Sequence, residues 1–393
     1  MSEPLSALAD RAWDAVVVGA GPAGTATATL LARQGLAVLL LDKAAFPRPK
    51  VCGGCLNRAA LTALDAAGLG DGIRRLGAPP LTRLRLHSGR RRATVPLREG
   101  AGVSRRALDS ALVGVARQAG AVFADDARAH AERPAGGMRP LRLTRGGEQI
   151  RVHARVVVVA SGLGPLPADD ATALPAIPVP GARIGAGTIA PEALPEVAPG
   201  EIVMVHGKGG YVGLARVEGG QLNVAAAFAP EFLRAVGGAG EAAAALVEGA
   251  GLPLAPLLRS LRWRGTPPLT FRRQGLALEQ LFVLGDAGGY VEPFTGEGMA
   301  WALAGALALA PVAAAAIERW DDHLAHRWER LHRTVVGRRQ RLCRVVAATL
   351  RRPALTAAVV TLLRAAPRLA APAVAAINAP PKPFRRALGG LPC

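Results

Sequence analysis

An α/β fold with two interleaved domains, followed by a basic helical region, is the architecture that this 393-residue sequence predicts. Three observations lead to it. Short apolar strands alternate with helices near the start of the chain, near 101–165 and near 275–318. Between these segments lie strand patterns suited to a separate antiparallel sheet. After residue 325 the composition becomes helical and strongly basic.

The first forty residues predict a strand–turn–helix–strand unit. Ala15–Val18 is short and apolar, as expected of a buried parallel strand. Thr25–Gln34 is rich in Ala and Leu, which favours a helix, and Gly35 stands where such a helix would end. Ala37–Leu41 is a second buried strand. The unit has the length of a dinucleotide-binding βαβ fingerprint and predicts a Rossmann-like domain.

The glycines of the turn, Gly19, Gly21 and Gly24, each have a physical reason. We expect Gly19 to permit the tight turn, Gly21 to let the backbone approach a pyrophosphate, and Gly24 to allow close helix–strand packing. The helix N-terminus offers free N–H groups to phosphate. Asp42 follows the second strand, eighteen residues after Gly24, where it can accept a hydrogen bond from a ribose hydroxyl.

The remaining elements follow in order along the chain. We expect a loop to Cys55, a helix capped by Asn57 and ending near Ala67, a hairpin over 81–97 around Gly89, a helix capped by Ser104, a strand at 121–124, and a hairpin ending in the apolar run 156–160. Further on, we expect a loop over 165–180, three strands within 201–228, a helix over 231–250, and a buried strand at 281–284.

The net charge of +19 is concentrated near the C-terminus, because residues 330–393 hold thirteen basic residues and no acid. Arginine far outnumbers lysine, which accounts for part of this excess. The sequence has no zinc-finger spacing and no basic pattern interleaved with aromatics, so we do not expect a nucleic-acid partner. The basic region is typical either of a helical cap on the fold or of a helix on an anionic membrane.

The location that we expect is cytoplasmic, with peripheral contact at the inner face of the membrane as a compatible addition. The first fourteen residues lack the charged start and apolar core of a signal peptide, which predicts a reducing compartment. The segment 299–317 is uncharged and long enough to span a bilayer, but it is mostly alanine and contains Pro311. We expect it to be a buried helix.

A second motif, "LGDAGGYVEPFTGEGMAWAL", lies at 284–303 and identifies the cofactor. Asp286 sits in a glycine-rich turn after a strand, where a carboxylate can bind sugar-alcohol hydroxyls. The helix beginning at Met299 places N–H groups and a positive dipole end near a ring that gains negative charge on reduction. Reduced flavin is such a ring.

Together, the 19–24 turn, Asp42 and the 285–298 segment resemble the FAD-binding fold of the aromatic hydroxylases and geranylgeranyl reductases, a glutathione reductase-type fold within the flavoprotein monooxygenase superfamily. The loop "KVCGGCL" is most similar to the reductase branch, where a Cys-Gly-Gly lies beside the flavin. The segment "SRRALD" resembles a family signature, which implies that Arg105 contacts FAD. The resemblance covers roughly residues 12–325.

The FAD-binding residues that follow from these motifs and the resemblance are Gly19, Gly21, Pro22, Ala23, Gly24, Asp42, Lys43, Cys52, Gly53, Gly54, Arg105, Gly162, Gly285, Asp286, Pro293, Gly296, Gly298 and Met299. The implied FAD-binding domain is discontinuous, with residues 12–75, 101–165 and 275–325. The substrate domain would comprise 76–100 and 166–274, and the basic helical region 326–393.

Catalytic and substrate-binding candidates are few. Cys52 is a candidate for a useful thiol near the flavin, and with Cys55 it also forms a CxxC that could be a redox pair or simply structural. Two cysteines alone make no metal site, and we expect none. Tyr211 matches a position of the reductase family's aromatic stretch, but that stretch otherwise carries small residues here. His206 is the histidine expected to face the chamber, and Glu297 is expected to cap its helix or to act in catalysis.

Three reactions remain open on these residues. The first is reduction of a double bond in an apolar, isoprenoid-like substrate by hydride from the reduced flavin N5. The second is hydroxylation of an aromatic or polyketide substrate by a monooxygenase, through a C4a-peroxyflavin. In both, NAD(P)H or another reductant would be a transient electron donor, since no second well-framed dinucleotide motif is present. The third, an electron-transfer flavoprotein, ranks last because the cysteines cannot supply a four-ligand cluster site.

Overall fold

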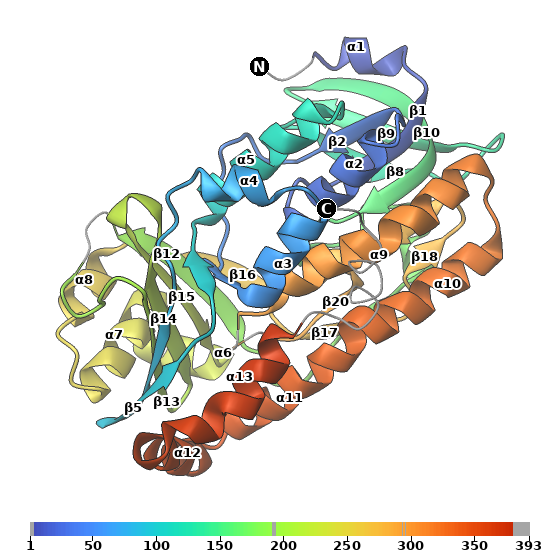
Figure 1. The fold of residues 1–393 in the computed structure, drawn as a ribbon. Helices are drawn as coiled ribbons and strands as arrows, with labels where there is room; N and C mark the ends of the chain where they lie inside the picture. Colours follow the sequence, from blue (N-terminus) through green and yellow to red (C-terminus); the bar gives the residue numbers. More distant parts are fainter. Residues whose placement is uncertain (1–3, 191–193, 293, 295, 380–393) are drawn as a thin grey trace.

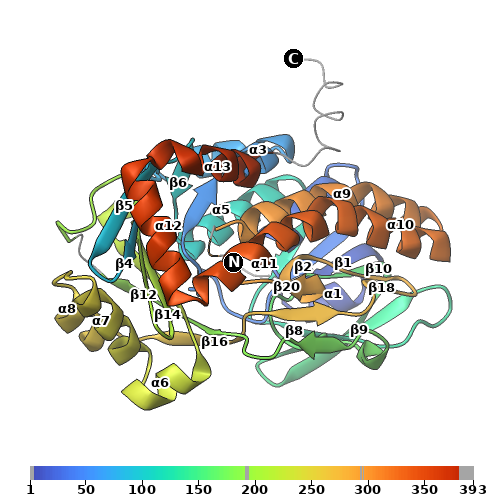
Figure 2. The same cartoon turned by 90° about the horizontal axis from the view of Figure 1, so that it is seen from below.

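The computed structural model describes residues 4–190, 194–292, 294 and 296–379. Two sheets with their own helices lie side by side, and the C-terminal helices run across both of them (Figures 1 and 2). The candidate site lies where loops of the first sheet meet one face of the second.

The first sheet has a parallel core whose strand order is β19, β10, β1, β2 and β7, with β18 antiparallel at one edge. Valines and leucines of these strands are fully buried, as is usual for a parallel sheet covered on both faces. The antiparallel hairpin β8–β9 continues from the long strand β10. The bounds are β1 (Trp13–Val18), β2 (Val38–Leu41), β7 (Val122–Ala124), β8 (Arg128–Ala131), β9 (Arg139–Arg145), β10 (Glu148–Val159), β18 (Ala277–Leu278) and β19 (Leu281–Val283).

Six helices accompany this sheet: α1 (Ser6–Ala9), α2 (Pro22–Ala32), α3 (Arg58–Ala66), α4 (Gly70–Arg74), α5 (Arg105–Gln118) and α9 (Gly298–Glu318). Helix α2 packs against α5 and α9 (Figure 1). It begins at Pro22, earlier than the expected Thr25, because proline is well suited to the first helical turn. The predicted caps are confirmed: Asn57 accepts a hydrogen bond from the backbone N–H of Ala60, and Ser104 accepts one from that of Ala107.

The second sheet has seven strands in the order β16 (Arg264–Pro268), β12 (Ile184–Ala190), β15 (Leu222–Phe228), β14 (Gly210–Arg216), β13 (Glu201–Gly207), β4 (Arg83–Ser88) and β5 (Arg91–Pro96). The predicted hairpin around Gly89 and the three predicted strands within 201–228 are therefore confirmed. They form one sheet because β4 pairs in parallel with β13, more than a hundred residues away.

Three helices pack beside the second sheet: α6 (Pro230–Val236), α7 (Ala239–Gly249) and α8 (Ala255–Ser260). The expected single helix over 231–250 is wrong. It is interrupted by Gly237 and Gly238, whose φ angles of 88° and 129° lie outside the helical region.

The expected loop over 165–180 also needs correction, because Ala176–Pro178 forms a short strand, β11, against β17 (Phe271–Arg273). This three-stranded sheet is completed by β20 (Gly289–Tyr290), and β3 (Cys55–Asn57) pairs with β6 (Gly100–Gly102).

Helix α9 is the uncharged segment singled out above, and it is a core helix of the fold. It is the one described helix that is long and apolar enough by itself to cross a membrane, yet 72% of its apolar window is buried inside the protein. A bent pair, Asp322–Leu350 with Pro353–Ala365, passes the same test of length and composition only when taken together.

The C-terminal region packs onto the rest of the protein. Helix α10 (Asp322–His332) continues through a π-helical turn at 333–337 into α11 (Arg338–Leu350), and α12 (Pro353–Ala365) and α13 (Ala371–Asn378) follow. Trp328 is fully buried, and its indole N–H donates to the carbonyl of Val283, 3.1 Å away. Breaks fall near Pro353 and Pro367 as expected, whereas Pro372 lies in the first turn of α13 and breaks nothing.

Candidate functional site

The glycine-rich turn between β1 and α2 has the geometry that its three glycines predict. A Cβ at Gly19 would lie 2.4 Å from the carbonyl oxygen of Ala160, and one at Gly24 would lie 1.9 Å from that of Gly19. Both positions therefore require glycine for packing. A Cβ at Gly21 would meet only the guanidinium groups of Arg105, at 3.3 Å, and Arg48, at 4.0 Å. Gly21 thus faces a cation-lined cradle, which suits a pyrophosphate.

Asp42, at the end of β2, holds this turn in place. Its Oδ2 accepts hydrogen bonds from the backbone N–H of Ala20, at 3.0 Å, and from the side chain of Arg48. Its Oδ1 accepts from the N–H of Ala44, also at 3.0 Å. The carboxylate is 7% exposed. It therefore organises the loop in addition to its predicted contact with a ribose, and that contact stays a prediction. Lys43, next to it, is exposed.

Two basic residues that the sequence analysis did not single out, Arg48 and Lys50, complete the cluster. Arg48 bridges two acids, with ion pairs of 3.0 Å to Asp42 and 2.9 Å to Asp109. Asp109 in turn holds Arg105 through two hydrogen bonds of 2.9 and 2.8 Å. Burial works against the charge of Arg105, but the Asp109 carboxylate outweighs it and raises the Arg105 pKa. The sequence feature that could have identified Arg48 and Lys50 is their position as two cationic residues in the proline-rich loop after Asp42.

Lys50 links this cluster to the other motifs. A Cβ at Gly162 would lie 2.9 Å from the Lys50 Nζ, and φ at Gly162 is +77°. Burial lowers the pKa of Lys50, the neighbouring charge of Arg105 lowers it further, and Asp286 opposes this shift. The turn of Asp286 packs on the start of α2, because a Cβ at Gly285 would lie 3.0 Å from the Cβ of Ala23. Motifs far apart in the sequence therefore converge on one cationic centre.

The cysteine loop at 51–55 lies between the first domain and the second sheet. Asn223 of β15 donates from Nδ2 to the carbonyl oxygen of Cys52, 2.9 Å away. Gly54 packs against the same asparagine, and a Cβ at Gly187 of β12 would lie 3.1 Å from Val51. The sequence analysis did not identify Asn223 as a site residue. The signal available was that Asn223 is the one side-chain amide in the otherwise apolar strand LNVAAAF. Gly53 is exposed, with no atoms crowding the position of a Cβ.

Both cysteines of this loop are free thiols. The Cys55 thiol donates to the carbonyl of Gly53, at 3.2 Å. Burial, together with the neighbouring Cys52, raises the Cys55 pKa to about 12. Cys55 is therefore a poor nucleophile at neutral pH. Cys52 lies near enough to Arg105 and Tyr290 to contribute to raising the pKa of each, which places Cys52 toward the cationic centre.

The start of α9 approaches this loop. A Cβ at Gly296 would lie 3.9 Å from the carbonyl oxygen of Cys55. Gly298 begins α9 and Met299 is buried behind it. Pro293 lies outside the described residues, so its predicted role stays a prediction.

Glu297 does not cap α9 through its side chain, which corrects that expectation. The carboxylate is 1% exposed and turns to the C-terminal region instead. Its Oε2 accepts from the thiol of Cys343, at 3.1 Å, and Arg339 lies 3.8 Å from its Oε1. Helix α11 thus covers the N-terminal end of α9.

An apolar cluster on the second sheet lies beside these loops. Tyr211 is 7% exposed and meets the ring of Phe294 edge-on, with centroids 5.0 Å apart. Tyr290 joins the same cluster, along with Met204, Leu269, Leu84, Leu86, Ile202 and Leu163. Burial, reinforced by the charge of Glu292, raises the Tyr211 pKa well above its usual value.

A buried ion pair borders this cluster and was not anticipated from the sequence. Arg183 and Glu292 are 2.9 Å apart and nearly inaccessible to solvent. The Arg183 guanidinium also lies 5.5 Å from the centroid of the Tyr211 ring. The chamber wall therefore combines aromatic rings with one fixed charge pair.

His206 is buried in β13, and its Nε2 contacts the carbonyl oxygen of Leu350 at the end of α11. Burial lowers its pKa. A neutral ring donating to Leu350 ties the second sheet to the C-terminal helices. The predicted substrate contact of His206 stays a prediction. Within the part of the chain that the structure describes, no three His, Cys, Asp or Glu side chains gather into a metal site.

The residues present fit FAD. The cradle that a Cβ at Gly21 would enter is lined by two guanidinium groups. Asp42 accepts a hydrogen bond from one of them, Arg48, and Asp286 acts electrostatically on Lys50; both carboxylates belong to motifs suited to binding sugar hydroxyls. The start of α9 lies against the cysteine loop, where the flavin ring of the resemblance would be.

Comparison with known proteins agrees with this geometry. Residues 12–169 match an FAD binding domain family. Menaquinone reductase of Mycobacterium tuberculosis is 37% identical over 161 residues, a match that spans 39% of this chain and 38% of that protein. A flavin-dependent brominase superposes with a TM-score of 0.77 at 15% identity, covering 96% of this chain and 98% of the brominase. The p-nitrophenol 4-monooxygenase of Pseudomonas putida gives a TM-score of 0.74 at 14% identity, covering 94% and 99%.

The fold and the site thus define a protein that binds FAD on a Rossmann-like domain and presents it to a second sheet. Over residues 12–169 the chain matches the FAD binding domain family, and its fold is shared with the flavin-dependent brominase and the p-nitrophenol 4-monooxygenase.

Proposed function

We propose that this protein reduces a carbon–carbon double bond in an apolar, isoprenoid-like substrate, as the geranylgeranyl reductases that it resembles do. The observation that carries the proposal is the position of the cysteine loop. Asn223 fixes the Cys52 carbonyl to the second sheet, and the apolar cluster around Tyr211 lies on that same sheet. A substrate between the loop and the cluster would meet apolar surface on one side and the FAD-binding loops on the other.

The mycobacterial relative supports an apolar substrate. Its name, menaquinone reductase, describes a reductase of an isoprenoid quinone, and its match extends over 161 residues. The match does not extend over the whole of either protein, so the substrate of this chain is our proposal.

FAD, once bound and reduced, would supply the hydride. The residues of this chain would bind and orient it: Arg48 and Arg105 at the pyrophosphate, Asp42 and Asp286 at the sugar hydroxyls, and the first turn of α9 at the ring. Helix α11 covers the end of α9 through Glu297 and so excludes water from that side. The apolar cluster would hold the double bond, because burial of apolar surface contributes roughly 25 cal/mol per Å².

One experiment separates this proposal from the alternative, a monooxygenase that hydroxylates an aromatic or polyketide substrate. FAD-loaded protein is reduced without oxygen and mixed with a polyprenyl compound that has no quinone ring, and the mass of the product is measured by mass spectrometry. Gain of two hydrogens without oxygen supports the proposal. Substrate turnover that requires O₂ and adds one oxygen atom would assign the protein to the monooxygenases.

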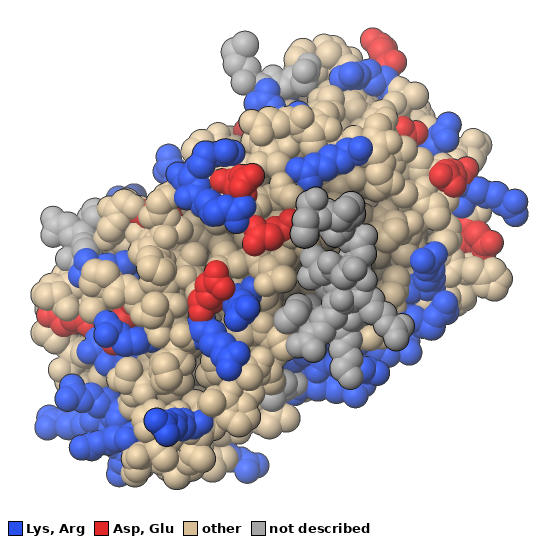
Figure 3. All heavy atoms as spheres, in the orientation of Figure 1, with Lys and Arg blue, Asp and Glu red and all other residues tan. Residues whose placement is uncertain are grey.

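Two partners belong to the proposal. The first is NAD(P)H or another reductant as a transient electron donor. The second is an anionic membrane surface, from which an isoprenoid substrate would be drawn. Helix α12 supports this second partner, since Leu355, Val359 and Leu362 recur at the spacing of one helix face and are 42%, 37% and 54% exposed. Lys and Arg side chains gather along the edge where β5 and α12 lie (Figures 1 and 3).

A further inference from the structure

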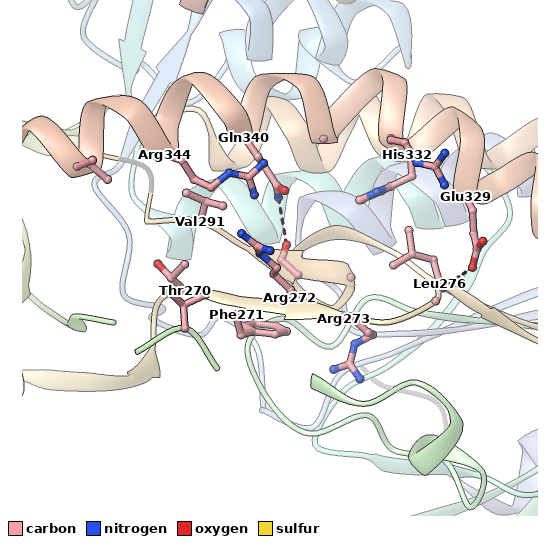
Figure 4. A pocket seen from close by; sticks show the side chains of 18 of the residues that line it. Thr270, Phe271, Arg272, Arg273, Leu276, Val291, Glu329, His332, Gln340 and Arg344 are labelled. Atoms are coloured by element: carbon pink, nitrogen blue, oxygen red, sulfur yellow. Dashed lines mark hydrogen bonds between the residues drawn. The ribbon is translucent and has the colours of Figure 1, made fainter. Parts of the chain in front are cut away.

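A cavity separate from the cationic centre at Gly21 lies between the continuous helix formed by α10 and α11 and the strand β17 (Figure 4). Its volume is about 470 Å³, within the range of small-molecule sites. Its lining includes none of the residues of the fingerprint turn or the cysteine loop. The C-terminal region, which the FAD-binding motifs do not explain, builds one whole wall.

The wall of this cavity carries an excess of positive charge. Arg272 from β17 and Arg344 from α11 point toward one another across it (Figure 4). Arg333 and Arg351 also line it, from the helical side. Among the described residues, no carboxylate lies within ion-pair distance of any of these four arginines. The one acid of the lining, Glu329, is engaged by the backbone N–H of Leu276, at 3.0 Å.

This arrangement brings like charges together, because the exposed Arg272, Arg333 and Arg351 share the cavity with Arg344. Arg344 is half-buried, and burial lowers its pKa, as do the charges of Arg272 and Arg341. Like charges that share a partly desolvated cavity repel more strongly than they would in water. Arg273 also lines the cavity, but its guanidinium donates to the carbonyls of Ala287 and Leu174 and is held away from a ligand.

The rest of the lining suits the organic part of a ligand. Apolar side chains of Val179, Leu276, Val291 and Ala347 line the cavity beside the arginines. Gln340 is held by a hydrogen bond of 3.2 Å to the carbonyl of Gly289, and it also lines a small neighbouring cavity at Asp286. The site thus offers guanidinium groups at one wall and apolar surface at another.

We propose that this cavity binds an organic phosphate or diphosphate, with its phosphate group between Arg272 and Arg344. Guanidinium groups bind phosphate oxygens in pairs of parallel hydrogen bonds, and two facing arginines match two edges of such a group. The proposal does not depend on the reaction at the flavin, because no residue of the fingerprint turn takes part in it.

The test is calorimetric titration of pyrophosphate into FAD-loaded protein at low ionic strength, so that FAD occupies the Gly21 cradle. We expect one site, and we expect Arg272→Gln and Arg344→Gln each to weaken binding about tenfold or more. Arg338→Gln is the matched control, because Arg338 is exposed on the same helix and does not line the cavity. Circular dichroism checks that each variant is folded. Absence of binding, or equal affinity in all four proteins, would overturn the proposal.

Competition identifies the source of the phosphate. Displacement of pyrophosphate by NADPH but not by NADH supports the 2′-phosphate of a dinucleotide. Displacement by geranyl diphosphate supports an isoprenoid headgroup. Pyrophosphate binding that neither compound displaces would overturn the organic ligand. Should the protein fail to retain FAD, the same titration with Gly21→Val protein removes the fingerprint turn as a competing site.

Discussion

The side-chain amide of Asn223 donates a hydrogen bond to the backbone carbonyl of Cys52, 2.9 Å away, across 171 positions of sequence. This bond joins the loop that carries both site cysteines to the sheet that forms the chamber wall. It places the cysteine loop between the cationic centre and the apolar cluster. It also leads to the first prediction.

Replacing Asn223 with alanine is expected to loosen the cysteine loop while leaving FAD bound. One hydrogen bond between neutral groups contributes about 0.5–1.5 kcal/mol to stability. Hydrogen exchange in the peptide that contains residues 51–55 should speed up, and turnover should fall. Gln221→Ala, at the exposed residue just before the same strand, is the control and should leave both unchanged. Wild-type exchange and turnover in Asn223→Ala would show that this bond has no role in the site.

Gly21→Val is expected to abolish FAD binding in a folded protein. The valine side chain would enter the cradle in front of Arg105 and Arg48, and only flexible guanidinium groups would have to move. Flavin absorbance after reconstitution measures the loss. Gly114→Ala, on an open face of α5, should bind FAD normally, whereas Gly24→Val should fail to fold because its Cβ would meet a backbone oxygen. A Gly21→Val protein that binds FAD like the wild type would refute the fingerprint.

Asp42→Ala is expected to weaken FAD binding about tenfold or more, since hydrogen bonds to a charged group contribute roughly 1.5–3 kcal/mol. The variant should also melt at a lower temperature without FAD, because Asp42 holds the N–H groups of Ala20 and Ala44. Asp14→Ala is a matched control: Asp14 likewise accepts from a backbone N–H, that of Ala37, but at the other end of β1. An unchanged dissociation constant for FAD in Asp42→Ala would contradict the assignment.

Cys52→Ser is expected to retain FAD and to lower the rate of flavin reduction or of product formation. Cys55→Ser should behave like the wild type, because the Cys55 thiol is engaged by Gly53 and held protonated. Rapid-mixing kinetics of both variants makes the comparison.

Alkylation provides an independent readout on the same two thiols. With a pKa of about 12, Cys55 has on the order of one thiolate in ten thousand at pH 8 and should resist iodoacetamide. Wild-type kinetics in both serine variants would mean that the two cysteines are structural.

The C-terminal region is expected to bring the protein to anionic vesicles at low salt. A basic residue near an anionic surface contributes about 1 kcal/mol, and salt screens the attraction. Leu355→Ser combined with Leu362→Ser should reduce cosedimentation, and Ile177→Ser, an exposed apolar residue of β11, should not. If the protein sediments with none of the lipids, or equally with neutral and anionic vesicles, the C-terminal region does not bind anionic membranes as proposed. Point variants are preferable to truncation before Arg330, because α11 contacts Glu297 and His206.

The sequence by itself determined the features whose physics is local. The turn at 19–24, the acid at Asp42, and the caps Asn57 and Ser104 each depend on residues within one supersecondary unit, so spacing and residue type were sufficient to predict them. Buried strands were predicted for the same reason, because a parallel strand that is covered on both faces must be apolar throughout.

Only the tertiary structure decided which distant segments meet. Arg48 bridges Asp42 and Asp109, and Glu297 turns to Arg339 on α11 instead of capping its own helix. The facing pair Arg272 and Arg344 likewise comes from a strand and a helix, 72 positions apart in the sequence. Periodicity fixes the face on which a side chain lies but not the element packed against that face, since packing is chosen by the whole core at once. For that reason the sequence was sufficient to predict candidate binding residues, whereas it did not predict the contacts that position them.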